Sequence, residues 1–198
     1  MLENIYNKAI MDKIPIMQSD GLEYLLKIIK ENNITRILEI GSAVGYSAIR
    51  MALVNENIKV TTIERDINRY NEAVNNISLM SLSDRITIIN KDASDVEITG
   101  LYDLIFIDAS KGHNIEFLQK FSKNLDKYGI IVCDNLSFHG LVENEELIQT
   151  KNQRGLVRKI KEFISFLDNN PDFVTKYVPV GDKISISVRK EDYYLKMK

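Results

Sequence analysis

An acidic residue and two glycines follow an apolar run near the start of the chain. Glu39 precedes the segment Gly41-Ser42-Ala43-Val44-Gly45. Glycines at positions 41 and 45 allow the sharp turn and the close backbone approach that a bound nucleoside needs. A carboxylate is unsuited to a phosphate but accepts hydrogen bonds from an ammonium or a hydroxyl group. Because no phosphate-binding lysine accompanies this loop, we expect it to bind S-adenosylmethionine rather than ATP or NAD.

Glu64 ends a second apolar run, about one strand–helix unit after the glycine loop. An acid at this place can accept hydrogen bonds from both hydroxyls of a ribose. The alternative is that Glu64 caps the next helix, which is a common use of an acid there. NAD-binding loops have the pattern Gly-x-Gly-x-x-Gly, but Ala43 and Tyr46 occupy its second and third glycine positions here. The loop therefore favours S-adenosylmethionine over a dinucleotide.

Two further acids, Asp108 and Asp134, end apolar runs, and Asn135 follows directly. If these runs are adjacent parallel strands, the two carboxylates and the carboxamide meet as an all-oxygen set suited to Mg²⁺. The alternative is that Asp108 caps a helix and Asp134-Asn135 forms a turn. Lys111 lies three residues after Asp108. It can act as a base on a metal-bound hydroxyl if a nearby cation and partial burial lower its pKa, or it is a solvated loop lysine.

Short apolar runs alternate with stretches of helical periodicity through most of the chain. The expected strands are residues 36–40, 59–63, 86–89, 104–108 and 130–134, and the clearest helix is residues 18–30. This alternation predicts a buried parallel sheet. Residues 173–180 and 183–189 read as two strands joined by a tight turn at Gly181-Asp182, so the last strand should be antiparallel. The acids above then gather at the carboxyl ends of the strands, where open α/β sheets bind ligands.

Composition indicates a single domain over residues 1–198, with residues 1–15 as an N-terminal extension. The net charge of −2 argues against a wholly basic nucleic-acid-binding surface, although a local patch remains compatible with it. Cys133 is the only cysteine, so no internal disulfide can form and a reducing compartment is favoured. The sequence contains no secretory signal and no apolar run long enough to cross a bilayer. We expect a cytoplasmic protein without membrane contact.

Residues 39–52, with Asp108-Ala109-Ser110-Lys111 and Asp134-Asn135, resemble the metal-dependent O-methyltransferases related to catechol O-methyltransferase and the plant caffeoyl-CoA enzymes. The resemblance spans residues 16–190. It implies an α/β fold with a Rossmann-like seven-stranded methyltransferase sheet, mostly parallel, an antiparallel C-terminal hairpin strand and helices on both faces. Family members are often homodimers, so we expect a homodimer in which the segment before Ile16 makes contact.

The same resemblance assigns roles to site residues. Asp108, Asp134 and Asn135 would bind Mg²⁺, or Mn²⁺ in its place, and Lys111 would be the catalytic base. The methionine portion of S-adenosylmethionine would lie against Glu39, Gly41 and Ser47, and its ribose against Glu64. Asp92 and Ala93 would lie beside the adenine, and Asp108 would also bind the cofactor.

Residues 135–142 and 154–160 resemble the bacterial family members that methylate 5-hydroxyuridine at the tRNA wobble position. Five basic residues and no acid occur between positions 151 and 161, beside a helical apolar face. Such a segment contacts RNA phosphates or is simply the solvated side of an amphipathic helix. We therefore expect methyl transfer to a tRNA anticodon loop. The alternatives are a small catechol-like phenol as acceptor and a nucleotide-binding module without catalysis, which would need neither Lys111 nor the metal set.

Overall fold

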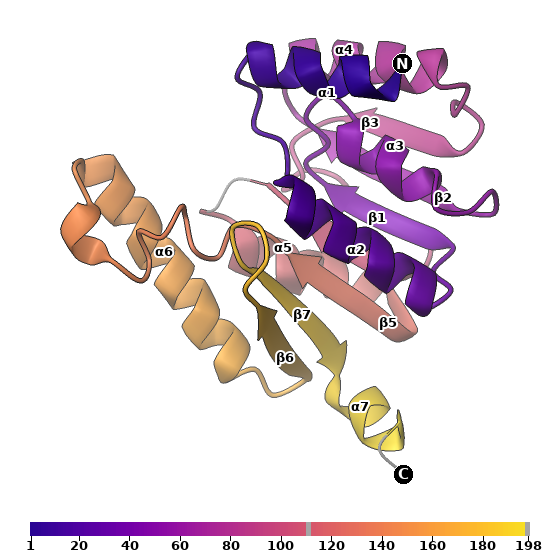
Figure 1. Cartoon of the computed structure of the whole chain (residues 1–198). Helices are drawn as coiled ribbons and strands as arrows, with labels where there is room; N and C mark the ends of the chain where they lie inside the picture. The colour runs from indigo at the N-terminus through magenta and orange to yellow at the C-terminus, as the bar shows by residue number, and fades with distance from the viewer. Residues whose placement is uncertain (110–111, 197–198) are drawn as a thin grey trace.

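Seven strands form one sheet at the centre of the molecule (Figure 1). The computed structural model describes residues 1–109 and 112–196, with side chains up to residue 193. The strands are β1 (Arg36–Ile40), β2 (Lys59–Glu64), β3 (Ile86–Asn90), β4 (Tyr102–Ile107), β5 (Leu125–Cys133), β6 (Phe173–Val178) and β7 (Ile184–Arg189). They lie in the order β3-β2-β1-β4-β5-β7-β6. This order and the helices around it confirm the predicted Rossmann-like seven-stranded sheet.

The strand order reverses between β1 and β4. The chain runs outward from β1 to β2 and β3, and then returns past β1 to form β4 on its other side. β1 to β5 pair in parallel, and Ile40 at the end of β1 is in register with Ile107 at the end of β4. β7 pairs antiparallel with both β5 and β6, as the alternating C-terminal sequence predicts. In open α/β sheets, a ligand-binding crevice forms where the order reverses.

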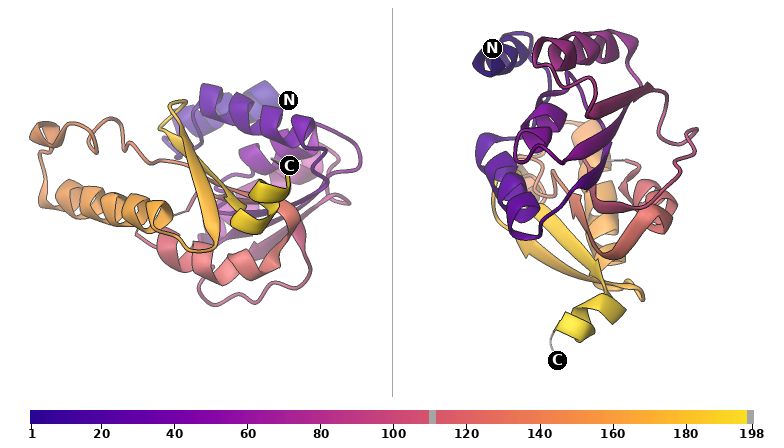
Figure 2. Two further views of the ribbon diagram at one scale, coloured as in Figure 1. Left: turned by 90° about the horizontal axis from the view of Figure 1, so that it is seen from below. Right: turned by 90° about the vertical axis from the view of Figure 1, so that its right-hand side faces the viewer.

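Helices cover both faces of the sheet (Figure 2). One face carries α1 (Leu2–Met11), α2 (Ser19–Glu31), α3 (Tyr46–Ala52) and α4 (Ile67–Leu79), and the other carries α5 (Asn114–Phe121) and α6 (Lys151–Asp168). Two 3₁₀ turns, η1 (Ser122–Asn124) and η2 (Glu145–Leu147), and the terminal α7 (Lys190–Lys196) complete the fold. No helix in the described part of the chain is long and apolar enough to span a membrane.

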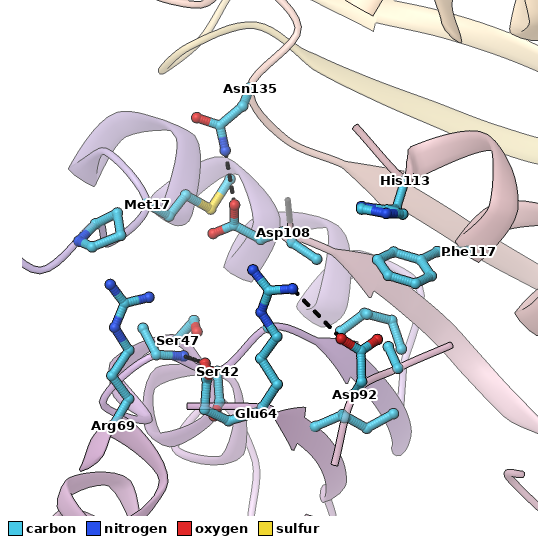
Figure 3. A pocket seen from close by; sticks show the side chains of 18 of the residues that line it. Met17, Ser42, Ser47, Glu64, Arg69, Asp92, Asp108, His113, Phe117 and Asn135 are labelled. Carbon is cyan, nitrogen blue, oxygen red and sulfur yellow. Dashed lines mark hydrogen bonds and ion pairs between the residues drawn. The ribbon is translucent and has the colours of Figure 1, made fainter. Parts of the chain in front are cut away.

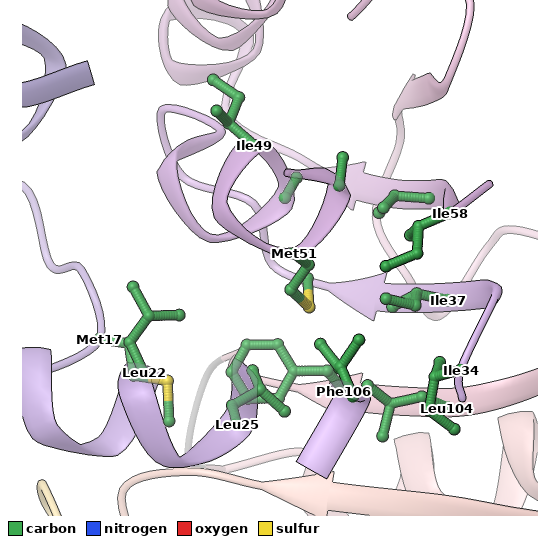
Figure 4. Packing of buried hydrophobic residues seen from close by; sticks show 14 of the residues in the cluster. Met17, Leu22, Leu25, Ile34, Ile37, Ile49, Met51, Ile58, Leu104 and Phe106 are labelled. Carbon is green, nitrogen blue, oxygen red and sulfur yellow. The ribbon is translucent and has the colours of Figure 1, made fainter. Parts of the chain in front are cut away.

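The strands are apolar on both sides because each side packs against helices. Leu104 and Phe106 of β4 belong to the hydrophobic cluster beneath α2 and α3, which Figure 4 shows. The alternate residues Ile105 and Ile107 belong to the cluster beneath α5 and α6. All four side chains are at most 1% exposed. A strand buried in this way holds its end firmly, so the polar residue that follows, Asp108, has a defined position.

A tight turn forms at Gly181-Asp182, as predicted, but the strands that flank it are shorter than predicted. The Lys183 amide donates to the Val180 carbonyl at 3.0 Å across this turn, whereas β6 ends at Val178 and β7 begins at Ile184. Pro179 cannot donate a backbone hydrogen bond. The Gly181 amide instead donates to the Asp20 carboxylate at 3.0 Å, and the Asp182 carbonyl accepts from the Ser137 amide at 2.9 Å. The paired strands end before this turn because Pro179 has no amide hydrogen and polar groups of the turn bond to distant loops.

The basic segment forms the first part of α6, which extends away from the body of the sheet (Figure 1). Thr150 caps this helix in a capping box with Gln153. Its apolar side is buried, as predicted, through Val157, Ile160, Phe163 and Leu167. Two of its cations have acidic neighbours, since Lys161 pairs with Glu145 and Arg158 lies 3.7 Å from Glu162. α6 is therefore an amphipathic helix whose basic side faces solvent.

Candidate functional site

A cavity of about 420 Å³ opens at the carboxyl ends of β1, β2 and β4 (Figure 3). Seven of the predicted site residues line it: Gly41, Ser47, Glu64, Asp92, Ala93, Asp108 and Asn135. Glu39 and Asp134 are buried at its edge and are not among the lining residues. Lys111 lies outside the described residues. The topology thus brings together side chains that are far apart in the sequence.

The glycine loop is shaped by close backbone contact. Gly41 has a φ of +98°, and a Cβ atom added there would lie 2.4 Å from the carbonyl oxygen of Asp108. Gly45 has a φ of +80° and lies close to Ala73 of α4. A Cβ atom added at Gly45 would lie 3.2 Å from the Cβ atom of Ala73. Side chains at these positions would meet both steric and conformational penalties. The loop therefore lies flat between β1, β4 and α4 and leaves the cavity above it open for a ligand.

Glu64 connects the loop to the second strand. Its Oε2 accepts a hydrogen bond from the Ala43 amide at 2.9 Å, and its Oε1 accepts one from the Asp66 amide at 2.8 Å. The cap of α4 is Asp66, whose carboxylate accepts from the amides of Asn68 and Arg69, so Glu64 does not have that role. Each carboxylate oxygen can accept a further hydrogen bond. Glu64 is thus a fixed acceptor at the cavity wall, suited to ribose hydroxyls.

Glu39 lies beneath the loop rather than in the cavity. The register of β1 and β2 places it opposite Thr62, and its side chain is fully buried. The hydroxyls of Ser47 and Thr62 donate to its two oxygens at 2.5 and 2.6 Å. Burial raises the pKa of Glu39 to about 7, although the two hydroxyl donors oppose that rise. Glu39 therefore reaches the cavity through Ser47, which it holds in place.

Asp108 and Asn135 meet at the end of β4 and β5. The pairing of Ile107 with Cys133 places the residues that follow side by side, as predicted. The side-chain amide of Asn135 donates from Nδ2 to Oδ1 of Asp108 at 2.8 Å. The backbone of Asn135 has a left-handed φ of +68°. α5 begins only at Asn114 with His113 at its N-cap, so Asp108 does not cap that helix. The two side chains form a polar pair that faces the cavity.

The oxygen atoms near this pair suit a hard cation. Asp134 is 4% exposed, and its amide donates to the Ile107 carbonyl at 3.2 Å. The described residues contain no group of three or more His, Cys, Asp and Glu side chains able to hold a metal ion. Two carboxylates and the Asn135 carboxamide are nevertheless the kinds of oxygen donor that could hold Mg²⁺ together with water and substrate oxygens. Rotation of the amide would present its oxygen in place of its nitrogen.

The cavity also contains residues that sequence reasoning missed. Arg65, Arg69 and Lys91 line it beside the acids, and so does the segment Pro15, Ile16 and Met17. Arg65 Nη1 lies 3.5 Å from the Asp92 carboxylate. Arg65 and Arg69 follow β2 at the same edge as Glu64, a position that could have drawn attention to them. No pattern in the sequence indicates that the connection between α1 and α2 enters the site.

Comparison with known proteins gives consistent matches. The family model described as O-methyltransferase matches residues 1–190. The catechol O-methyltransferase of Niastella koreensis is 32% identical over 152 residues, which are 72% of this chain and 67% of that protein.

Solved structures share the fold over nearly the whole chain. A candidate caffeoyl-CoA O-methyltransferase from Staphylococcus aureus superposes with a TM-score of 0.90 at 30% identity, covering 95% of this chain and 91% of that one. An O-methyltransferase from Bacillus cereus in complex with S-adenosylhomocysteine superposes with a TM-score of 0.81 at 23% identity, covering 96% and 90% of the two chains. Both likenesses extend over more than nine-tenths of this chain.

Proposed function

Because the chain belongs to the O-methyltransferase family, we propose that it transfers a methyl group from S-adenosylmethionine to a phenolic hydroxyl. The acceptor is a small aromatic molecule with two oxygens on adjacent carbons, as in a catechol. The observation that carries this proposal is the Asp108–Asn135 pair, which faces the same cavity as Glu64 and the glycine loop. The catechol O-methyltransferase from Niastella koreensis supports this class of acceptor.

The cavity has a suitable place for each part of the cofactor. Glu64 accepts from the ribose hydroxyls, and Asp92 and Ala93 line the wall where the adenine would lie. The loop from Gly41 to Ser47 would hold the methionine portion. Support comes from the Bacillus cereus structure, whose bound S-adenosylhomocysteine is the demethylated form of this cofactor. This arrangement leaves the side of the cavity near Asp108 and Asn135 for the acceptor.

The reaction needs a deprotonated hydroxyl held in line with the sulfonium methyl group. Asp108, Asp134 and Asn135 would hold Mg²⁺ or Mn²⁺, and this ion would favour deprotonation of the acceptor hydroxyl and help to orient it. Lys111 is proposed as the base that takes the hydroxyl proton. The acceptor oxygen then forms a bond to the methyl carbon as the carbon–sulfur bond breaks, and S-adenosylhomocysteine leaves as a neutral thioether. The side chains bind and orient both substrates, and Lys111 removes the proton.

A comparison of paired acceptors tests the need for two oxygens. Labelled methyl transfer to a catechol should exceed transfer to the phenol with one hydroxyl removed by ~10²-fold or more, because the second oxygen fixes the orientation. Asp108→Asn should lower transfer to the catechol. Equal rates with both acceptors would contradict the proposed acceptor class.

A tRNA anticodon loop is the second candidate acceptor, and one observation favours it. In 5-hydroxyuridine the 5-hydroxyl and the 4-carbonyl are also on adjacent carbons. Leu156 of the basic helix α6 lines the cavity, and a Cβ atom at Gly112 would lie 2.9 Å from Nζ of Lys159. Cations beside the cavity could contact phosphates while an unpaired base enters it.

Removal of two cations separates the two candidates. Lys151→Gln combined with Arg154→Gln should weaken binding of an anticodon stem-loop and flatten its salt dependence. It should leave methylation of a catechol unchanged. RNA that accepts no label under conditions where a catechol does would remove the second candidate.

We also propose a homodimer that uses α1. Ile10 and Met11 on this helix are 53% and 80% exposed, and Leu79 at the end of α4 is 60% exposed. Exposed apolar side chains that together form a contiguous patch favour a protein–protein contact. Ile10→Glu with Met11→Glu should shift the mass measured by light scattering from dimer to monomer, whereas a monomeric wild type would contradict the proposal.

A further inference from the structure

Arg69 is a cation in the cavity for which the proposed methyl transfer gives no use. It lies in the first turn of α4, and its half-buried side chain lines the cavity. Figure 3 shows its guanidinium extending toward Met17 on the side where Ser42 and Ser47 lie. Its backbone amide donates to Asp66. Within residues 1–109 and 112–196, however, its guanidinium has no hydrogen bond and no ion pair.

A buried hydroxyl group lies at the same end of the cavity. Ser42 lines the cavity and is 2% exposed. Its Oγ has no hydrogen-bond partner among the described residues. A buried polar atom without a partner is costly, and in native proteins it usually bonds to a ligand or to ordered water. The hydroxyl of Ser42 and the guanidinium of Arg69 are both donors, so together they suit an anionic oxygen.

The other arginine of the cavity has a different place. Arg65 lies near the Asp92 carboxylate, at the wall assigned to the adenine. The acids Glu64 and Asp108 suit hydroxyl or ammonium groups but repel a carboxylate. The methionine portion of the cofactor carries both an ammonium and a carboxylate. Among the described residues, Arg69 is therefore a cation on the glycine-loop side of the cavity that can pair with that carboxylate, and an arginine can do so with two parallel hydrogen bonds.

We propose that Arg69, assisted by the hydroxyl of Ser42, binds the carboxylate of the methionine portion of S-adenosylmethionine. This assignment rests on the proposed function, because it takes the cofactor to lie along the glycine loop. Arg69 then has two effects. It adds affinity for the amino-acid end of the cofactor, and it distinguishes the intact cofactor from adenosine compounds that lack the carboxylate.

Calorimetric titration with two ligands tests the assignment. One ligand is S-adenosylhomocysteine, and the other is its decarboxylated analogue, which keeps the ammonium group. Arg69→Met should weaken binding of S-adenosylhomocysteine by ~10- to 100-fold, the range for a charged hydrogen bond. It should change the affinity for the analogue by less than about two-fold, since no carboxylate is present to pair. Arg69→Lys should keep part of the preference for S-adenosylhomocysteine over the analogue, because lysine keeps the positive charge but lacks the planar guanidinium group.

Arg65→Met is the matched control, because it removes the same kind of side chain from the other end of the cavity. It should change the affinity for both ligands by the same factor. Equal losses for both ligands in Arg69→Met would overturn the assignment. So would unchanged binding of S-adenosylhomocysteine together with a higher KM for the acceptor, which would make Arg69 an acceptor-binding residue. If Arg69→Met does not fold, Arg69→Lys is titrated in its place. A preference for S-adenosylhomocysteine over the analogue as large as that of the wild type would then contradict pairing of the carboxylate with the planar guanidinium of Arg69. Wild-type protein that binds neither ligand would refute the proposed function instead.

Discussion

Replacement of Glu39 by glutamine should change how the stability of the protein depends on pH. Glu39 is fully buried, and its pKa is raised to about 7 from the 4.5 of an exposed glutamate. Between these values the native state keeps a proton that the unfolded chain has lost. The native state binds more protons there, so the free energy of unfolding falls as the pH rises through this interval. The difference corresponds to ~3 kcal/mol in total, at about 1.36 kcal/mol for each pH unit.

Glutamine is neutral at every pH of interest and nearly isosteric with glutamic acid. In Glu39→Gln the hydroxyls of Ser47 and Thr62 can still bond to the side chain, since a hydroxyl can donate or accept. Urea denaturation at a series of pH values from about 5 to about 8 measures the effect. Across this range the wild type should lose ~2.5 kcal/mol of unfolding free energy relative to Glu39→Gln.

Glu56→Gln is the control for this prediction, because Glu56 is an exposed residue in the turn before β2. It should keep the pH dependence of the wild type. Parallel curves for the wild type and Glu39→Gln would refute the idea that a buried, protonated carboxyl lies beneath the loop. A wild type that gains stability over the variant as the pH rises would refute it too, because the carboxyl would then be ionised and stabilised in the fold.

Three more outcomes follow from the site. Gly41→Ala should lower the unfolding free energy by more than Gly100→Ala. Both positions have a positive φ, but only a side chain at position 41 would meet a backbone atom, the Asp108 carbonyl oxygen. Equal losses in denaturant titrations would contradict this close approach. Lys111→Met should lower kcat by ~10²- to 10⁴-fold with the melting temperature unchanged, and a loss below a few-fold would remove the lysine as the base. Chelation with EDTA should abolish methyl transfer, and added Mg²⁺ or Mn²⁺ should restore it, whereas full activity in EDTA would refute the metal assignment.

The sequence allows the sheet edge to be predicted because each strand is a short apolar run that ends in a polar residue. Parallel pairing of β4 with β5 is enough to bring Asp108 beside Asn135, and no long-range detail is needed. Burial on both faces of the sheet made these strands easy to recognise. The cap of α4 shows the limit of this reasoning. Glu64 and Asp66 are both acids at the end of β2, and only the observed hydrogen bonds assign the cap to Asp66.

Features that depend on contacts between distant segments could not be predicted. The Gly181 amide of the hairpin turn donates a hydrogen bond to Asp20, which is 161 residues away in the chain. The place of Glu39 beneath the loop depends on the register that puts it opposite Thr62. The direction of Arg69 depends on how α4 packs beside the loop, and periodicity carries no information about that. Such contacts determine the interior of the site, whereas local patterns determine only its location.

Following a trideuterated methyl group from S-adenosylmethionine by mass spectrometry tests the proposed methyl transfer most directly. Purified protein with Mg²⁺ is incubated with a catechol and, separately, with RNA that contains 5-hydroxyuridine. The labelled methyl group should appear on a hydroxyl oxygen of an acceptor with two adjacent oxygens, at a rate that depends on Asp108. Transfer to nitrogen or carbon, or no transfer to either acceptor while S-adenosylhomocysteine binds in the cavity, would contradict the proposed transfer.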